Sequence, residues 1–289
     1  MLRSMTGFGR AEGLVGGKKV TVELRSLNSK QLDLQVKLPA LWREKEITLR
    51  QWAGERVLRG KADLYIGMEN AQEAKRTAFN ADLIRAYYAE LSDVARTVAP
   101  GQETDLLAQV LRLPDVAAPV KEEFDPAEWE AVTALAEQAW KAFEGFRVAE
   151  GTKLHAELKQ RTANITALLE EVAAMDGGRI RRTRERLHAR LEELQATVDQ
   201  ERFEQELVYY LEKLDVTEEK LRLSTHCTYF LSTMAEEEGQ GRKLGFIAQE
   251  MGREINTLGS KANDAAMQQR VVLMKDELEK IKEQVLNVL

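Results

Sequence analysis

Residues 20–38, VTVELRSLNSKQLDLQVKL, decide the fold of the N-terminal part of the chain. Apolar residues occupy every second position in two runs, within residues 20–24 and within residues 32–38. This period of two is typical of strands that bury one face, because successive side chains of a strand point to opposite sides of the sheet. Pro39 follows the second run and is expected to end it. The stretch therefore predicts two strands of one sheet.

The residues on either side extend this sheet. Gly16 and Gly17 predict a tight turn that joins the first of these strands to an earlier strand starting near Thr6. Residues 41–58 lose the alternation and are predicted to be helical, whereas residues 62–68 alternate again. The expected N-terminal unit is an antiparallel sheet plus a helix, in the order strand, strand, strand, helix, strand.

The rest of the chain, from about residue 80, has helical spacing of its apolar residues. One amphipathic helix is expected to end at Gly177-Gly178, and residues 180–198 predict a long arm that pairs with another helix or subunit. The predicted fold class is therefore α+β, with long amphipathic helices after the sheet. The predicted divisions are an N-terminal α/β domain at 1–150, a helical arm at 151–200 and a helical C-terminal domain at 201–289.

A row of arginines lies along the predicted arm at three- and four-residue spacing. Its members are Arg179, Arg182, Arg186 and Arg190. Guanidinium groups in a row match a phosphate backbone, but they match the nearby glutamates of the same or a neighbouring helix equally well. Both interpretations, a phosphate-binding row and a set of salt bridges, are open at the level of sequence.

The composition excludes several classes of protein. The chain has 289 residues, a formal net charge of −6 and one cysteine, Cys227, which excludes an intrachain disulfide and a thiolate zinc site. No apolar run approaches the roughly 20 residues that span a bilayer, so no membrane partner is expected. These features predict a cytoplasmic protein.

Charge is distributed unevenly along the chain. Residues 1–70 contain 13 Lys or Arg and 8 Asp or Glu, whereas residues 201–289 contain 12 and 17. A local basic field attracts a polyanion even when the net charge is negative. The two ends therefore either have different partners or present ordinary solvated faces.

The C-terminal 89 residues place ionisable side chains on one predicted helix face. At 3.6 residues per turn, Asp215, Glu219, Arg222 and His226 fall on one strip that begins near Val208. Carboxylates, a guanidinium group and an imidazole one turn apart suit phosphoryl-transfer chemistry, as metal ligands, charge stabiliser and acid or base. The alternative is a salt-bridged helix surface with an incidental histidine.

A second helix, after Gly245, has polar rows beside its apolar stripe. These rows contain Asn256, Thr257 and Ser260, which are poor helix formers. Either the helix breaks at Gly259, or these hydroxyls and amides bind a partner helix or a ligand.

Several motifs resemble one known family from end to end. The motifs are RSMTGFGRAEG at 3–13, VELRSLNSKQLDL at 22–34, LRGKAD at 58–63, RVAEGTKL at 147–154, QEMGREINTLGSKAND at 249–264 and KDELEKIKEQVLN at 275–287. They are similar to the YicC/YloC family of bacterial proteins. The resemblance implies an endoribonuclease that prefers single strands, an α/β N-terminal region, a helical C-terminal domain and a hexameric, ring-like assembly that closes around RNA. The chain departs from the family pattern at Gly245, where an aspartate is usual, and at Gly252, where an asparagine is usual.

The leading hypothesis is an endoribonuclease that cleaves single-stranded or loop RNA with the help of Mg²⁺ or Mn²⁺. The expected metal ligands are Asp215, Glu219, Glu250 and Glu254. The expected catalytic set is His226, as acid or base, with Glu219, Glu250, Glu254, Arg253 and Lys261. The expected RNA-binding residues are Arg3, Arg10, Arg25, Lys30, Arg59, Lys61, Arg222, Asn256 and Ser260.

Two alternatives remain open. In a metal-free variant, His226 with arginine and lysine support lets the 2′-hydroxyl of RNA attack the phosphate and leave a cyclic phosphate. In the other, the chain is a non-catalytic, oligomeric RNA-binding scaffold that delivers RNA to a separate nuclease. The expected partners are RNA, further copies of the chain, in a hexamer by family resemblance, and other RNA-decay factors.

Overall fold

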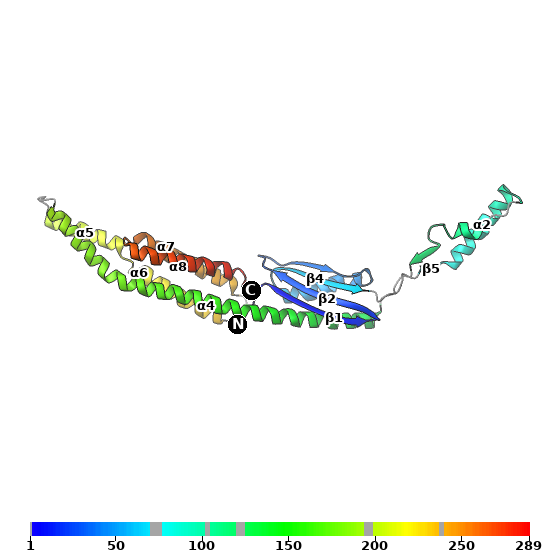
Figure 1. Ribbon diagram of the computed structural model, residues 1–289, viewed down its shortest axis with the longest axis horizontal. Helices are drawn as coiled ribbons and strands as arrows, with labels where there is room; N and C mark the ends of the chain where they lie inside the picture. The colour runs from blue at the N-terminus through cyan, green and yellow to red at the C-terminus, as the bar shows by residue number, and fades with distance from the viewer. Residues whose placement is uncertain (1, 70–76, 102–104, 120–124, 194–198, 237–239) are drawn as a thin grey trace.

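The fold has two hydrophobic cores along one long helix. The computed structural model describes residues 2–69, 77–101, 105–119, 125–193, 199–236 and 240–289. Figure 1 shows an elongated molecule in which helix α4 (Pro126–Glu193) runs beneath both the N-terminal sheet and the C-terminal helices. The α+β class predicted from the sequence is confirmed.

The N-terminal sheet has four strands in the order β1-β2-β4-β3. Their bounds are β1 (Gly7–Val15), β2 (Lys18–Leu27), β3 (Asp33–Lys37) and β4 (Lys61–Glu69). The turn between β1 and β2 consists of Gly16 and Gly17, with φ of 56° and 75°. Positive φ at both residues suits a two-residue hairpin turn and favours glycine. The strands and turn predicted from residues 6–68 are confirmed.

One strand pair differs from the predicted antiparallel sheet. β1 pairs with β2 and β2 with β4 in antiparallel register, but β3 is parallel to β4. The cause is the intervening segment, a 3-10 helix η1 (Ala40–Lys45) and helix α1 (Glu46–Val57), which together form a crossover. A crossover of a dozen or more residues returns the chain in the same direction, whereas a short turn reverses it.

A separate extension leaves the sheet beyond β4. It comprises β5 (Thr77–Phe79), α2 (Ala81–Val98), α3 (Leu106–Val110) and β6 (Ala117–Pro119). β5 pairs with β6 in antiparallel register, and no residue of α2 is buried. Figure 1 shows α2 projecting away from the rest of the molecule. The apolar side of α2 is half-buried at Leu83, Ile84 and Leu91, whereas Val94 and Val98 are exposed.

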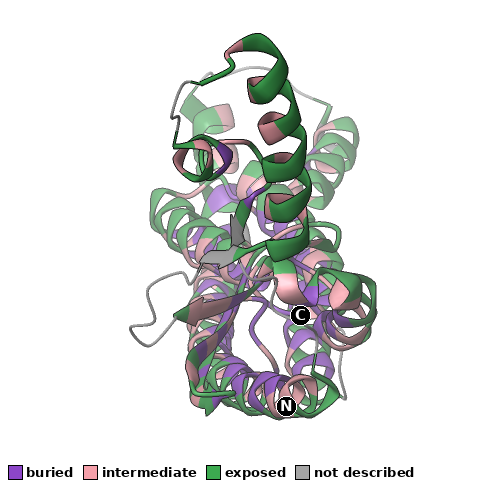
Figure 2. Ribbon diagram, turned by 90° about the vertical axis from the view of Figure 1, so that its right-hand side faces the viewer, coloured by how far each residue is buried: buried purple, intermediate pink, exposed green. Residues whose placement is uncertain are grey.

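Helix α4 contributes to both cores. Val132, Ala139 and Phe143 pack under the sheet, and Leu158, Ile165 and Val172 pack against the C-terminal helices. Figure 2 shows buried residues along the inner faces of these elements. The helix passes the expected domain division at residue 150 without interruption.

The predicted helix end at Gly177-Gly178 is wrong, because α4 continues to Glu193. A glycine inside a helix lowers the stability of the helix by about 1 kcal/mol relative to alanine. Tertiary contacts of the residues on either side of the two glycines offset this loss. Asp176 and Arg179, which flank the two glycines, are both buried and paired with each other at 2.8 Å.

Four further helices follow α4 in the described part of the chain, and the last three of them complete the C-terminal core. They are α5 (Gln200–Leu214), α6 (Thr217–Ala235), α7 (Gly241–Lys261) and α8 (Ala265–Val285). A Cβ at Gly259 would lie 2.9 Å from Val271, and one at Gly252 would lie 3.2 Å from Leu278. The missing side chains allow α7 and α8 to pack closely. No described helix is both long and apolar enough to cross a membrane.

The two ends of the chain lie together at the junction of the two parts (Figure 1). Met5 N donates to Asn287 O at 2.8 Å, and Leu289 N donates to Arg3 O at 2.9 Å. Arg147 of α4 is buried beside them and donates from Nε to Ser4 O at 2.8 Å. The N-terminal segment is thereby fixed both to α4 and to the end of α8.

The close approach of the sheet to α4 predicts the effect of Gly9→Ala. A Cβ at Gly9 would overlap the backbone carbonyl oxygen of Ala139, which cannot move without displacing α4. We expect the free energy of unfolding to fall by about 2 kcal/mol in urea titration. Gly177→Ala is the control, because open space surrounds its Cβ, and it should raise stability by up to about 1 kcal/mol. Equal effects of the two substitutions would contradict this packing.

Candidate functional site

The ionisable side chains predicted from the sequence meet between α6 and α7. Two ion pairs cross between these helices: Lys261 Nζ lies 2.7 Å from Glu219 Oε1, and an Arg222 guanidinium nitrogen lies 3.9 Å from Glu254 Oε1. The two pairs fix an antiparallel register between α6 and α7. The structure thus brings together four of the predicted residues, and the partners of the two pairs are 42 and 32 positions apart in the sequence.

Glu219 is the most enclosed of these carboxylates. Glu219 is 5% exposed, and its Oε2 atom is buried without a hydrogen-bond partner among the described residues. Burying a carboxylate is costly unless a cation compensates its charge. Lys261 provides that cation from the last turn of α7, where its charge also favours the C-terminal end of the helix dipole.

Arg222 covers Glu254 at the surface. The guanidinium group is half-exposed and also pairs with Glu218 on its own helix. Glu254 is buried, so its charge faces mainly this arginine. Arg222 therefore holds two carboxylates, and only part of its surface is open to a ligand.

Asp215 does not lie on the predicted helix strip. The chain leaves helical geometry between α5 and α6, so Val208 belongs to a different helix from Glu219. Asp215 accepts hydrogen bonds from Thr217 N at 3.0 Å and Thr217 Oγ1 at 2.7 Å. These bonds to Thr217 lower the pKa of the Asp215 carboxyl. The Asp215 side chain thereby accepts a hydrogen bond from an N–H group that the first turn of α6 leaves unpaired. This turn explains why the helical geometry is interrupted between α5 and α6.

A buried arginine holds the ends of the helices that form the site. Arg179 of α4 donates to Leu214 O at 2.6 Å and to Lys261 O at 3.2 Å. Asp176 pairs with Arg179 and with Lys220 Nζ, the latter at 2.7 Å. The last carbonyl groups of α5 and α7 have no partner within their own helices, and this guanidinium group supplies one.

The arginine row of the arm is therefore at least partly structural. Arg179 is buried, and Arg182 lies 3.8 Å from Asp264. The sequence analysis did not predict the contacts of Arg179. Its pairing with Asp176 could have been predicted, because residues three positions apart lie on one face of a helix.

The outer face of α7 is polar and exposed. Glu250 and Arg253 form an ion pair at 2.9 Å within the helix. The helix does not break at Gly259, as one alternative proposed, but continues to Lys261. The hydroxyl of Ser260 donates to the backbone carbonyl of Thr257 at 2.8 Å, whereas Asn256 makes no hydrogen bond within the described residues.

His226 lies at the edge of the same face. It is one turn beyond Arg222 on α6, and the antiparallel register places it level with Glu250 of α7. The imidazole is partly exposed and has no hydrogen bond or ion pair with any described residue. The neighbouring Cys227 is buried, and burial raises the pKa of its thiol to about 11. Cys227 is therefore a neutral thiol near pH 7 and a poor nucleophile.

The four expected metal ligands do not converge in one subunit. Asp215 caps a turn, and Glu219, Glu250 and Glu254 face different cations. Within the described ranges, no group of three or more His, Cys, Asp or Glu side chains is placed to hold a metal ion. A hard divalent cation requires several oxygen ligands around one point. A Mg²⁺ or Mn²⁺ ion bound by the described residues of one chain would therefore use one or two of these carboxylates and take its other ligands from water and phosphate oxygens.

The expected RNA-binding residues of the N-terminal part lie in different places. Arg3 pairs with Glu144 of α4 at 3.2 Å, and Arg10 and Arg25 pair with carboxylates on the exposed face of the sheet. Lys30 is exposed in the loop after β2. Arg59 donates from Nε to a backbone carbonyl, that of Ser29, at 3.2 Å.

Arg25 and Lys61 come closest to a shared site. They line a hollow of about 370 Å³ on the exposed sheet face, together with Glu23 and Asp63. Arg25 also lies over the ring of Phe8, at 5.4 Å from its centroid. Lys37 lines the same hollow, so its three cations exceed its two carboxylates by only one charge.

Comparison with known proteins places this geometry in a family context. Residues 2–156 match the model of the endoribonuclease YicC-like N-terminal region, and residues 172–289 match that of the endoribonuclease YicC-like C-terminal domain. A Clostridioides difficile protein named probable endoribonuclease YicC is 31% identical over 293 residues, with 100% of both chains covered. A Haemophilus influenzae protein of the same name is 30% identical over 289 residues, again with 100% of both chains covered.

The Glu219–Lys261 pair predicts a large effect of Lys261→Met. This substitution leaves a buried carboxylate without its cation, and we expect the free energy of unfolding to fall by about 3 kcal/mol. Lys275→Met on the exposed side of α8 should change stability by less than about 0.5 kcal/mol. The double variant Lys261→Met, Glu219→Met should recover most of the loss. A loss that persists in the double variant would indicate that Lys261 acts elsewhere.

Proposed function

Since this chain belongs to the YicC-like endoribonuclease family, we propose that it is an RNA-cleaving enzyme that acts on single-stranded or loop regions. The names and full-length similarity of the relatives support the class of reaction. The preference for unpaired RNA is supported by the exposed polar face of α6 and α7, because unpaired nucleotides expose their base edges and sugar hydroxyls to such side chains.

The observation that most favours a particular chemistry is the state of His226. It is partly exposed, unpaired among the described residues and one turn from Arg222, so it is accessible to a substrate. In the proposed reaction, neutral His226 removes the proton of a 2′-hydroxyl group. The 2′-oxygen forms a bond to phosphorus, the bond from phosphorus to the 5′-oxygen breaks, and the departing oxygen takes up a proton. The product is a 2′,3′-cyclic phosphate.

Arginines near His226 are suited to the charge that develops on phosphate in this reaction. Arg253 is more exposed than Arg222, and its only ion pair with a described residue is with Glu250, one turn away on the same helix. Guanidinium groups bind phosphate oxygens in a bidentate manner and stabilise the transition state electrostatically. Asn256 and Ser260 extend the same face of α7 and offer further hydrogen bonds to RNA.

We derive no step that uses a metal ion. Within one subunit the expected carboxylates Glu219, Glu250 and Glu254 are each paired with a cation, so a Mg²⁺ or Mn²⁺ route would use one or two of them together with water and RNA phosphate oxygens. This route remains the alternative chemistry for the same activity.

A second function is a non-catalytic RNA-binding scaffold that delivers RNA to other decay factors. The observation in its favour is that His226 has no described partner to orient its ring, whereas a catalytic base is commonly oriented by a third group.

The cleavage assay separates these functions. With a labelled RNA that contains a hairpin and a single-stranded tail, His226→Ala should lower the cleavage rate at least about 100-fold, and His155→Ala on α4 should not. Cutting by the wild type should continue in EDTA and stop when the nucleotide at the cut is 2′-deoxy. A 5′-phosphate product that depends on metal would contradict the 2′-hydroxyl route. Equal cutting by all proteins would indicate a contaminant and support the scaffold.

We also propose that the chain works as a homo-oligomer, with six copies as the family resemblance implies. Support comes from α2, which has no buried residue although Val94 and Val98 are 56% and 76% exposed. Apolar surface of this kind is typically covered by another chain.

Light scattering after size exclusion tests the assembly. The measured mass of the wild type should exceed that of one 32.7 kDa chain. The double variant Val94→Asp, Val98→Asp should have a mass closer to that of the monomer. Its two hydrophobic cores should unfold at the same temperature as in the wild type. A monomeric wild type would contradict the assembly. The same measurement on His226→Ala establishes that this variant retains the native oligomer.

A further inference from the structure

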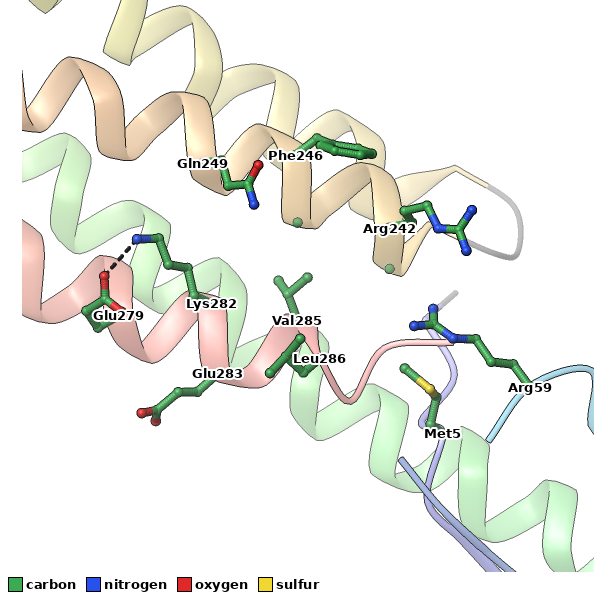
Figure 3. A pocket seen from close by; sticks show the side chains of 12 residues that line it. Met5, Arg59, Arg242, Phe246, Gln249, Glu279, Lys282, Glu283, Val285 and Leu286 are labelled. Atoms are coloured by element: carbon green, nitrogen blue, oxygen red, sulfur yellow. Dashed lines mark hydrogen bonds and ion pairs between the residues drawn. The ribbon is translucent and has the colours of Figure 1, made fainter. Parts of the chain in front are cut away.

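A groove of about 500 Å³ lies at the opposite end of α7 from the Glu219–Lys261 pair. Its walls are the first turns of α7 and the last turns of α8, and Met5 and Arg59 of the N-terminal part close one end (Figure 3). The groove therefore lies where the two parts of the chain meet, beside the hydrogen bonds that fix the two termini together.

Two glycines of α7 shape the wall that faces α8. A Cβ at Gly241 would overlap the carbonyl oxygen of Val288, so the start of α7 is in contact with the segment that follows α8. Gly245 lies one turn further along, and its nearest neighbour, Val285, is 3.8 Å from the Cβ position. The absence of a side chain at position 245 leaves this part of the wall open.

Two guanidinium groups face the same end of the groove. Figure 3 shows Arg242 from α7 and Arg59 from the loop before β4 extending into this opening from opposite sides. Arg242 has no hydrogen bond or ion pair with any described residue, and the recorded bond of Arg59 goes to a backbone carbonyl. Lys282 differs, because it is neutralised by Glu279 at 2.7 Å. Among the described residues, the opening thus contains two guanidinium groups without a paired carboxylate. Glu283 also lines the groove, but its side chain points away from these two arginines (Figure 3).

An exposed aromatic ring lies beside these charges. Phe246 is 62% exposed, and it lies one turn from Arg242 on α7 (Figure 3). The amide of Gln249 also lines the groove and has no hydrogen bond within the described part of the chain. A phenylalanine ring, an amide and uncompensated cations are the combination that binds a single-stranded nucleic acid, through stacking, base-edge hydrogen bonds and phosphate contacts.

We propose that this groove binds a nucleotide of single-stranded RNA, with its phosphate between Arg59 and Arg242, its base on Phe246 and its base edge at Gln249. The proposal rests on the proposed function, which makes RNA the ligand. Gln249, Arg253, Asn256 and Ser260 form one polar row along α7. RNA that leaves the groove along this row reaches the level of His226, so the groove positions the strand for the site on α6 and α7.

Fluorescence anisotropy tests the groove separately from catalysis. The probe is a fluorescein-labelled, 2′-O-methyl 12-nucleotide RNA of mixed sequence, which the 2′-hydroxyl route does not cleave. Phe246→Leu should weaken binding about tenfold through the loss of one stacked base. Phe146→Leu, at an exposed phenylalanine of α4 that does not line the groove, is the matched control and should bind like the wild type.

Salt dependence tests the phosphate contact. Arg242→Gln should reduce the slope of log Kobs against log[salt] by about 0.7, the value for one phosphate contact to a single strand. Arg43→Gln, at an exposed arginine of η1 outside the groove, should leave the slope unchanged. Thermal unfolding of all four variants should match the wild type because each altered side chain is exposed.

The outcomes distinguish the groove from the function as a whole. If the wild type binds RNA and the variants Phe246→Leu and Arg242→Gln bind it as well as their controls do, the proposal that the groove binds RNA is overturned. The proposed function is then unaffected. A wild type that neither binds nor cleaves any RNA would overturn both. Weakening by the two groove variants, and not by their controls, supports the groove.

Discussion

The buried guanidinium group of Arg179 is the contact on which the C-terminal part depends. It joins α4 to the ends of α5 and α7 and, through Asp176 and Lys220, to the start of α6. A charged group in this position is stable because each of its three nitrogens donates to a carbonyl or a carboxylate oxygen. It holds the end of α7 at Lys261, so the same contact sets the register in which Glu219 and Glu254 meet their cations.

The consequence for chemistry is that the acidic side chains of this surface are only partly compensated. Glu219, Glu250 and Glu254 each pair with a lysine or an arginine, Arg222 is shared between Glu254 and Glu218, and Asp215 is held by the hydroxyl group of Thr217. The carboxylates therefore outnumber the cations and the local charge is negative, while His226, Asn256 and Gln249 have no hydrogen bond or ion pair among the described residues. A face of this kind recognises a strand by hydrogen bonds and stacking, with charge supplied mainly by Arg242 and Arg59 at the groove.

Local patterns predicted the elements well, because strand alternation and the Gly16-Gly17 turn depend on neighbouring residues alone. The parallel pairing of β3 was not predicted, since strand direction depends on the crossover formed by η1 and α1. The end expected at Gly177-Gly178 failed because tertiary contacts outweighed the low helix propensity of glycine.

In the site, the pairing of Glu219 with Lys261 depends on the packing of two helices, which spacing within one helix does not determine. Asp215 was assigned to a helix strip because the Asp-Val-Thr turn after α5 was not recognised. The groove was missed for a similar reason: Arg59 and Arg242 are far apart in sequence, and only the close packing of the chain ends brings them to one opening.

Photo-crosslinking of a 4-thiouridine RNA to the wild-type protein, with peptide mapping by mass spectrometry, tests most directly whether α7 is the surface that contacts RNA. We expect crosslinks concentrated between residues 242 and 257. Crosslinks confined to the exposed face of the sheet, around Phe8 and Tyr65, would contradict this assignment of the RNA-binding surface.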